Sequence, residues 1–112
     1  METILIVDDE ENIRLSLEGI LSDEGFRTMV AATGEEALAL AQGDVPDLVL
    51  LDIWMPGMDG LEVLDRLRAL TDALPVVVIS GHGTISTAVD ATKRGAFDFI
   101  EKPFASDRIL VS

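Results

Sequence analysis

The sequence predicts a single α/β domain in which helices cover a five-stranded parallel sheet. Five short apolar runs alternate along the chain with segments whose apolar residues recur at helical spacing. Three of the runs, at 4–7, 48–52 and 76–80, lack the apolar–polar alternation of half-exposed strands, as expected of strands buried on both faces. The chain has 112 residues, of which 48% are hydrophobic. That length and composition suit one domain with a substantial core.

The five apolar runs are the predicted strands. They cover residues 4–7, 26–32, 48–52, 76–80 and 97–101. The second run is the weakest, which favours a place at the edge of the sheet. Pro75 precedes the fourth run and Pro103 follows the fifth. These positions fit strand ends, because proline cannot donate a hydrogen bond to a neighbouring strand.

Helix signals lie between the first three strands. Residues 13–21 place their apolar side chains on one helical face, and Gly25 is the predicted end of that helix. Thr33 and Glu36 form a capping-box pattern, which predicts a short second helix through Ala41.

Three more helices are predicted in the second half of the chain. Asp59 and Thr84 are the predicted caps of the third and fourth helices, and Gly95 ends the fourth. Ser106 is the candidate cap of a last helix, which is cut off at Ser112 after barely two turns. Because helices average about 11 residues, we expect the chain to be an N-terminal fragment of a longer protein.

The charge and composition exclude several classes of function. Asp and Glu number 21 against 8 Lys and Arg, and the resulting net charge of −13 repels nucleic acid and anionic membranes. The sequence has no cysteine, which excludes disulfide and thiol chemistry. It also lacks a membrane-spanning apolar run and a signal-peptide pattern. We therefore expect a soluble, cytoplasmic protein that binds neither nucleic acid nor membranes directly.

Five β–α units of this size are typical of a doubly wound sheet with the flavodoxin-like strand order 2-1-3-4-5. This order is the one that known α/β folds of this kind adopt, and the residues alone do not determine it. In such sheets, ligands bind beyond the carboxyl ends of the strands, near the switch point between strands one and three.

Polar side chains lie at, or directly after, the carboxyl ends of four predicted strands. They are Asp8 and Asp9, Asp52, Ser80, and Lys102. Three neighbouring carboxylates repel one another unless a cation offsets their charge, and an acidic site with oxygen ligands suits Mg²⁺. A lysine and a hydroxyl beside such a site would stabilise a phosphoryl group. Asp52 lies at the switch-point strand, and it is therefore the best candidate nucleophile.

Together these motifs resemble the receiver domain of two-component response regulators. In chain order they are Asp8-Asp9, Leu50-Leu51-Asp52, Met55-Pro56-Gly57-Met58-Asp59-Gly60, Ser80-Gly81 and Lys102-Pro103-Phe104. Each motif alone is weak, but five in order at strand ends are specific. Residues 79–83 and 96–103 are similar to the nitrogen-regulator branch (NtrC and NtrX), and 52–56 favours the NtrX type. We expect one receiver domain over residues 1–112.

The resemblance implies roles for the site residues. Asp52 would accept a phosphoryl group from a phosphohistidine of a sensor histidine kinase. Asp9 and Asp52 would bind Mg²⁺ or Mn²⁺, with Asp8 acting mainly through water. The backbone carbonyl of Trp54 would be the third protein ligand, and Lys102 would pair with the phosphoryl oxygens.

The resemblance also implies a conformational switch. Ser80 would move to hydrogen-bond the phosphoryl group, and Phe99 would swing inward behind it. This shift would remodel the face formed by the fourth helix, the fifth strand and the fifth helix, biasing two pre-existing states. Trp54 and His82, two residues past Asp52 and Ser80, would tune the lifetime of the phosphoryl group through water access.

The partners implied by the resemblance are a sensor histidine kinase and an output domain of the same chain. By the subfamily resemblance, that output would be an AAA+ ATPase with a DNA-binding domain, regulating transcription. A homodimer through the switch face is a further expectation. We expect a regulator and not an enzyme, since the domain would catalyse only its own phosphorylation and dephosphorylation.

Three other functions are alternatives. A phosphatase of the haloacid-dehalogenase type typically has a second acid two residues after its nucleophile, where this chain has Trp54. A flavodoxin-like flavin binder needs a phosphate loop rich in hydroxyls and glycine, where this chain has four acids at 8–11. A degenerate receiver acting as a phosphorylation-independent protein-binding module stays open, although all five functional positions are filled.

Overall fold

The structure is a computed structural model that describes residues 2–53, 60–71, 73–80 and 85–101, with only the backbone described at 85–87 and 101. Its strands are β1 (Thr3–Val7), β2 (Arg27–Ala31), β3 (Leu48–Asp52), β4 (Val76–Ser80) and β5 (Asp98–Glu101). Its helices are α1 (Glu11–Asp23), α2 (Gly34–Gly43), α3 (Gly60–Leu70) and α4 (Ile85–Lys93). The predicted last helix lies outside the described residues. Every helix in the described ranges is too short or too polar to cross a membrane.

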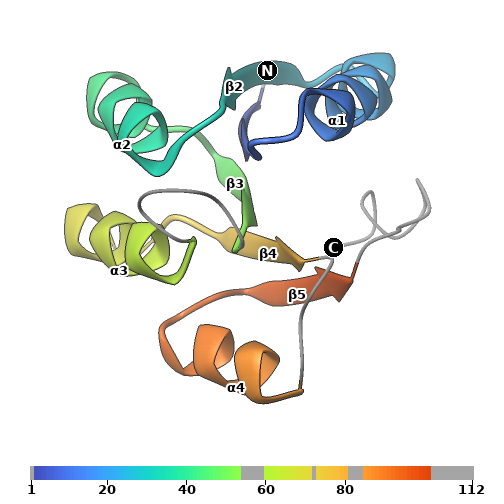
Figure 1. Ribbon diagram of the computed structural model, residues 1–112. Helices are drawn as coiled ribbons and strands as arrows, with labels where there is room; N and C mark the ends of the chain where they lie inside the picture. The colour runs from blue at the N-terminus through green and yellow to red at the C-terminus, as the bar shows by residue number, and fades with distance from the viewer. Residues whose placement is uncertain (1, 54–59, 72, 81–84, 102–112) are drawn as a thin grey trace.

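The strands form one sheet in the order β2-β1-β3-β4-β5, and all four neighbouring pairs are parallel. Figure 1 shows α2 and α3 on one side of this sheet and α1 on the other. The predicted doubly wound fold and its strand order are therefore confirmed. The weak second strand lies at the sheet edge, as its sequence indicated.

Strand alternation divides the core into two clusters, one on each face of the sheet. Leu5 and Val7 of β1 belong to the larger cluster, which α2, α3 and α4 cover. Ile4 and Ile6 belong to the smaller cluster. Helix α1 contributes Leu17 and Leu21 to this cluster. Burial on both faces explains why the central strands are apolar without alternation.

Small boundary differences separate the predicted elements from the observed ones. The helix predicted to end at Ala41 continues to Gly43, because the Asp44 N–H still donates to the carbonyl of Leu40, at 3.0 Å. Phe97 was expected to begin the fifth strand but precedes it, with 68% of its surface exposed. Gly25 follows the end of α1 with a φ of 89°, so the predicted glycine stop is confirmed.

The predicted capping box at the start of α2 is present with one difference. Thr33 Oγ1 accepts a hydrogen bond from the Glu36 N–H at 3.1 Å. The Glu36 carboxylate reaches back to the N–H of Ala32 at 2.8 Å, one residue before the cap. Both bonds satisfy backbone donors at or just before the beginning of the helix.

Replacing Thr33 with alanine is expected to lower the free energy of unfolding by about 1 kcal/mol, because the cap acceptor is lost. Urea unfolding followed by circular dichroism would measure the change. Glu35→Ala removes an exposed side chain from the same turn and serves as the control. Equal stability of Thr33→Ala and the wild type would show that the cap contributes nothing.

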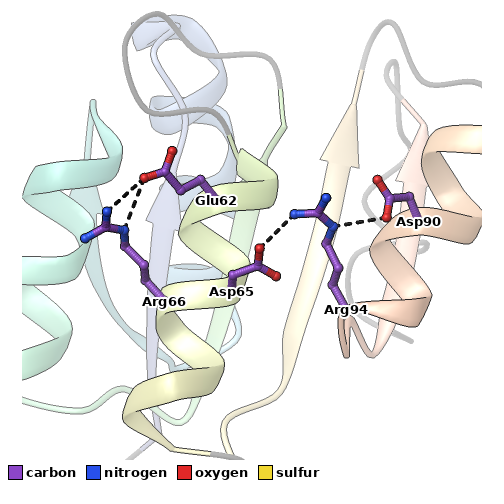
Figure 2. A network of polar contacts seen from close by, with 5 residues as sticks. All are labelled: Glu62, Asp65, Arg66, Asp90 and Arg94. Atoms are coloured by element: carbon purple, nitrogen blue, oxygen red, sulfur yellow. Dashed lines mark hydrogen bonds and ion pairs between the residues drawn. The ribbon is translucent and has the colours of Figure 1, made fainter.

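A chain of exposed ion pairs connects α3 to the end of α4 (Figure 2). Arg94 Nη1 lies 2.8 Å from Asp65 Oδ2 of α3, and Arg94 Nε lies 3.0 Å from Asp90 Oδ1 of α4. Arg66 pairs with Glu62 within α3 at 3.0 Å. Solvent screens such pairs, and each contributes about 1 kcal/mol or less. The Arg94 pairs therefore link α3 to the end of α4 but add little to the stability of the fold.

Candidate functional site

The register of the central strands brings the predicted acids together at the switch point of the sheet. Ile6 and Val7 of β1 pair with Leu50 and Leu51 of β3. One further step along both strands places Asp8 beside Asp52. Strand alternation puts both residues on the face of the sheet that α1 covers, because Ile6 and Leu50 belong to that cluster.

The predicted site residues are also unusual in their burial. In the described ranges, the buried polar or charged side chains are Asp8, Asp52 and Ser80, with exposed fractions of 1%, 3% and 0%. Burying a carboxylate costs free energy unless other groups or ions compensate for it. The two buried carboxylates of Asp8 and Asp52, side by side at one edge of the sheet, therefore indicate a functional site.

The backbone fixes the ends of the strands that carry these side chains. The Asp8 N–H donates to the carbonyl of Ala31 on β2, at 3.1 Å. The N–H of Ile53, directly after Asp52, donates to the carbonyl of Ile79 on β4, at 3.3 Å. Ser80 is the next residue of β4, so it lies at the same edge as Asp52.

Three consecutive acids form a cluster at the end of β1. The carboxylate oxygens of Asp8, Asp9 and Glu10 lie within 4.8 Å of one another, and Asp9 and Glu10 are exposed. Neighbouring oxygen ligands of an octahedral Mg²⁺ ion lie about 3 Å apart, so these oxygens would have to move closer together to share one ion. The donor set, which is oxygen only and acidic, therefore fits a divalent cation.

Two hydrogen bonds orient Asp8 within this cluster. Its Oδ1 accepts from the N–H of Glu10 at 2.9 Å, which closes the turn before α1. Its backbone carbonyl accepts from Arg14 Nη1 at 2.8 Å. Arg14 lies in the first turns of α1, and its guanidinium places a positive charge beside the acids.

Glu10 and Arg14 are parts of the site that the sequence reasoning missed. Glu10 is exposed to solvent, and one of its carboxylate oxygens lies within 4.8 Å of those of Asp8 and Asp9. Its position directly after the acid pair was the available signal. Arg14 gave a weaker signal, because its hydrogen bond to the Asp8 carbonyl depends on the direction in which α1 runs after the end of β1.

Of the remaining predicted site residues, Phe99 lies in the part of the chain that the structure describes, and the others do not. Phe99 on β5 is half-buried and packs against the larger core cluster. Trp54, His82 and Lys102 lie outside the described residues, as do the predicted helix caps Asp59, Thr84 and Ser106. Their predicted roles stay predictions.

The fold and the site together define a class of protein. It is a doubly wound α/β domain with buried acids at its switch point and an adjacent acidic cluster that can hold a divalent cation. The family model described as the response regulator receiver domain matches residues 4–112. The chain belongs to this family.

Curated relatives place the chain near the NtrX proteins. Over 110 residues it is 53% identical to the nitrogen assimilation regulatory protein NtrX of Azorhizobium caulinodans and 49% identical to a putative NtrX-like response regulator of Rickettsia bellii. These alignments cover 96% of this chain and 24% and 23% of the relatives. The chain thus spans about a quarter of the length of these relatives.

Solved structures agree with the curated relatives. The crystal structure of the receiver domain of NtrX from Brucella abortus superposes with a TM-score of 0.92 and 54% identity, covering 96% of this chain and 92% of that one. A CheY-like receiver domain from Methanospirillum hungatei gives 0.95 at 32% identity, covering 99% and 89%. The predicted resemblance to NtrX-type receivers is confirmed.

Proposed function

We propose that this domain accepts a phosphoryl group on Asp52 and transmits that modification to an output domain. The observation that carries the proposal is that Asp8, Asp52 and Ser80 are all buried at the same edge of the sheet, where the carboxyl ends of β1, β3 and β4 meet. A buried carboxylate beside a second acid is an attacking group kept away from bulk water. A curated relative that is 39% identical, with 87% of its length covered, is the sporulation initiation phosphotransferase F of Bacillus subtilis. Its name supports phosphoryl transfer by this fold.

In the proposed reaction, a carboxylate oxygen of Asp52 forms a bond to phosphorus as the bond from phosphorus to the leaving nitrogen or oxygen breaks. The donor would be a phosphohistidine of a sensor histidine kinase. Asp8, Asp9 and Asp52 are the residues proposed to hold Mg²⁺ or Mn²⁺. The cation, when bound, offsets the charge of the acids and of the phosphoryl oxygens. Lys102 is proposed to add the second positive charge.

The proposed output follows the acceptor step. Ser80 is buried at the same edge of the sheet, and Phe99 of the neighbouring strand β5 packs against the larger core cluster. We propose that these two side chains move when Asp52 is phosphorylated. The relatives include the transcriptional regulator DctD of Rhizobium meliloti, 41% identical, which supports transcriptional control through further domains. We propose that this domain regulates and does not turn over an outside substrate.

A fluorescence titration tests the acceptor and the cation together. Trp54 is the only tryptophan of the sequence and lies two residues past Asp52. Added Mg²⁺ is expected to change its fluorescence with saturation, and beryllofluoride, which mimics a phosphoryl group on a carboxylate, is expected to change it again. Asp52→Ala should lose the beryllofluoride response. Asp23→Ala, an exposed aspartate at the end of α1, should keep it.

Two outcomes would contradict the proposal. A beryllofluoride response that persists in Asp52→Ala would show that another group accepts the mimic. A wild-type chain that gives no response and no covalent adduct with acetyl phosphate would favour a phosphorylation-independent binding module.

A further inference from the structure

Gly60, the first residue of α3, lies directly against the backbone at the end of β3. The residue is buried, and its N–H donates to the carbonyl of Ile53 at 2.8 Å. A Cβ atom at Gly60 would overlap the carbonyl oxygen of Asp52 and the Cα of Ile53. Both are backbone atoms, so neither can rotate away as the end of a flexible side chain would.

Four other glycines, Gly19, Gly25, Gly43 and Gly95, do not lie this close to backbone atoms of another segment. A Cβ at Gly19, Gly25 or Gly43 would meet no atom within 4 Å. At Gly95 it would meet the flexible side chain of Arg68 at 3.0 Å. Gly60 is also not among the described glycines with positive φ, which are Gly25 and Gly95. Space beside Asp52, and not an unusual backbone conformation, is what requires glycine here.

We propose that Gly60 is a positioning residue for the phosphoryl acceptor. Its missing side chain lets the start of α3 lie against the Asp52 carbonyl, and its N–H holds the next peptide in place. The direction of the Asp52 carboxylate depends on that backbone. This inference rests on the proposed function. Because transfer depends on alignment, a displacement of about 1 Å can slow such a reaction about 100-fold.

A merely structural role for Gly60 makes a different prediction. If the glycine only permits close packing, alanine would lower stability without changing the reactivity of the molecules that stay folded. If the glycine positions Asp52, alanine would slow the reaction in a folded protein. The test therefore needs a folded variant, and Gly19 provides a way to obtain one.

The parent for the test is Gly19→Ala, which replaces an exposed glycine inside α1 and is expected to raise stability. The test variant adds Gly60→Ala to that parent. Labelling by saturating acetyl phosphate with Mg²⁺ would be followed by intact mass. The amide resonances of Asp52 and Ile53 would be compared without metal, and thermal unfolding would report the fold.

We expect the double variant to unfold cooperatively and to label about 10-fold to 100-fold more slowly than its parent at saturation. Its Asp52 and Ile53 amide resonances should move, while those of Thr28 on β2 should not. A folded double variant that labels within about twofold of the parent would overturn the inference. So would a double variant that does not fold, because Gly60 would then serve the whole fold.

The proposed function can fail separately from this inference. A parent that takes no label would contradict phosphorylation of Asp52. The amide resonances would still report whether Gly60 fixes the end of β3: movement confined to Asp52 and Ile53 supports positioning, and unchanged resonances overturn it.

Discussion

Replacing Asp9 with asparagine is expected to weaken Mg²⁺ binding about 100-fold or more, since a charged ligand is lost and even indirect partners of a metal typically matter about 10-fold to 100-fold. Asp9 is exposed, and its carboxylate lies in the acidic cluster with Asp8 and Glu10. Its removal should leave the fold intact, because exposed substitutions usually change stability by about 0.5 kcal/mol or less. Trp54 fluorescence at fixed ionic strength would measure the affinity.

The control for this prediction is Glu11→Gln, which removes one negative charge two residues further along. Glu11 lies in the first turn of α1 but outside the acidic cluster. Its replacement should change Mg²⁺ affinity only slightly, through the general field. If the two variants bind Mg²⁺ equally, net charge and not a site at Asp9 determines the affinity.

Replacing Leu67 with alanine is expected to lower the free energy of unfolding by about 2–5 kcal/mol, the cost of a large-to-small change in a packed core. Leu67 is fully buried on the face of α3 that packs against the larger cluster. Small domains are stable by only about 5–15 kcal/mol, so the variant should lie close to unfolding. Urea unfolding would measure the loss.

Leu70→Ala is the matched control for the core prediction. It lies on the same helix with 44% of its surface exposed, so the same atoms are removed from a position that water already reaches. We expect a loss of about 1 kcal/mol or less. Similar losses for both variants would indicate that α3 does not pack as the structure shows.

Much of the fold was predictable because its signals are local. The apolar runs, the capping box at Thr33 and the glycine stop at Gly25 act within a few residues, and each is present in the structure. Parallel topology then brings the strand ends to one edge. Asp8 and Asp52 could be placed together once the strand order of known folds of this kind was assumed, because that order makes the first and third strands neighbours.

Other features of the structure depend on contacts that have no local signal. Gly60 lies against the backbone of Asp52 and Ile53, and a glycine at a helix start has many common explanations. Arg94 bridges α3 and α4, a contact set by how the two helices lie on the sheet.

The most direct test of the proposed function is to find where a phosphoryl group is attached. The chain would be incubated with acetyl phosphate and Mg²⁺, and peptide mapping by mass spectrometry would locate the label. We expect one phosphoryl group on Asp52, dependent on the cation and absent from Asp52→Asn. A label on a different residue, or no label on a folded wild-type chain, would contradict the proposal that Asp52 is the phosphoryl acceptor.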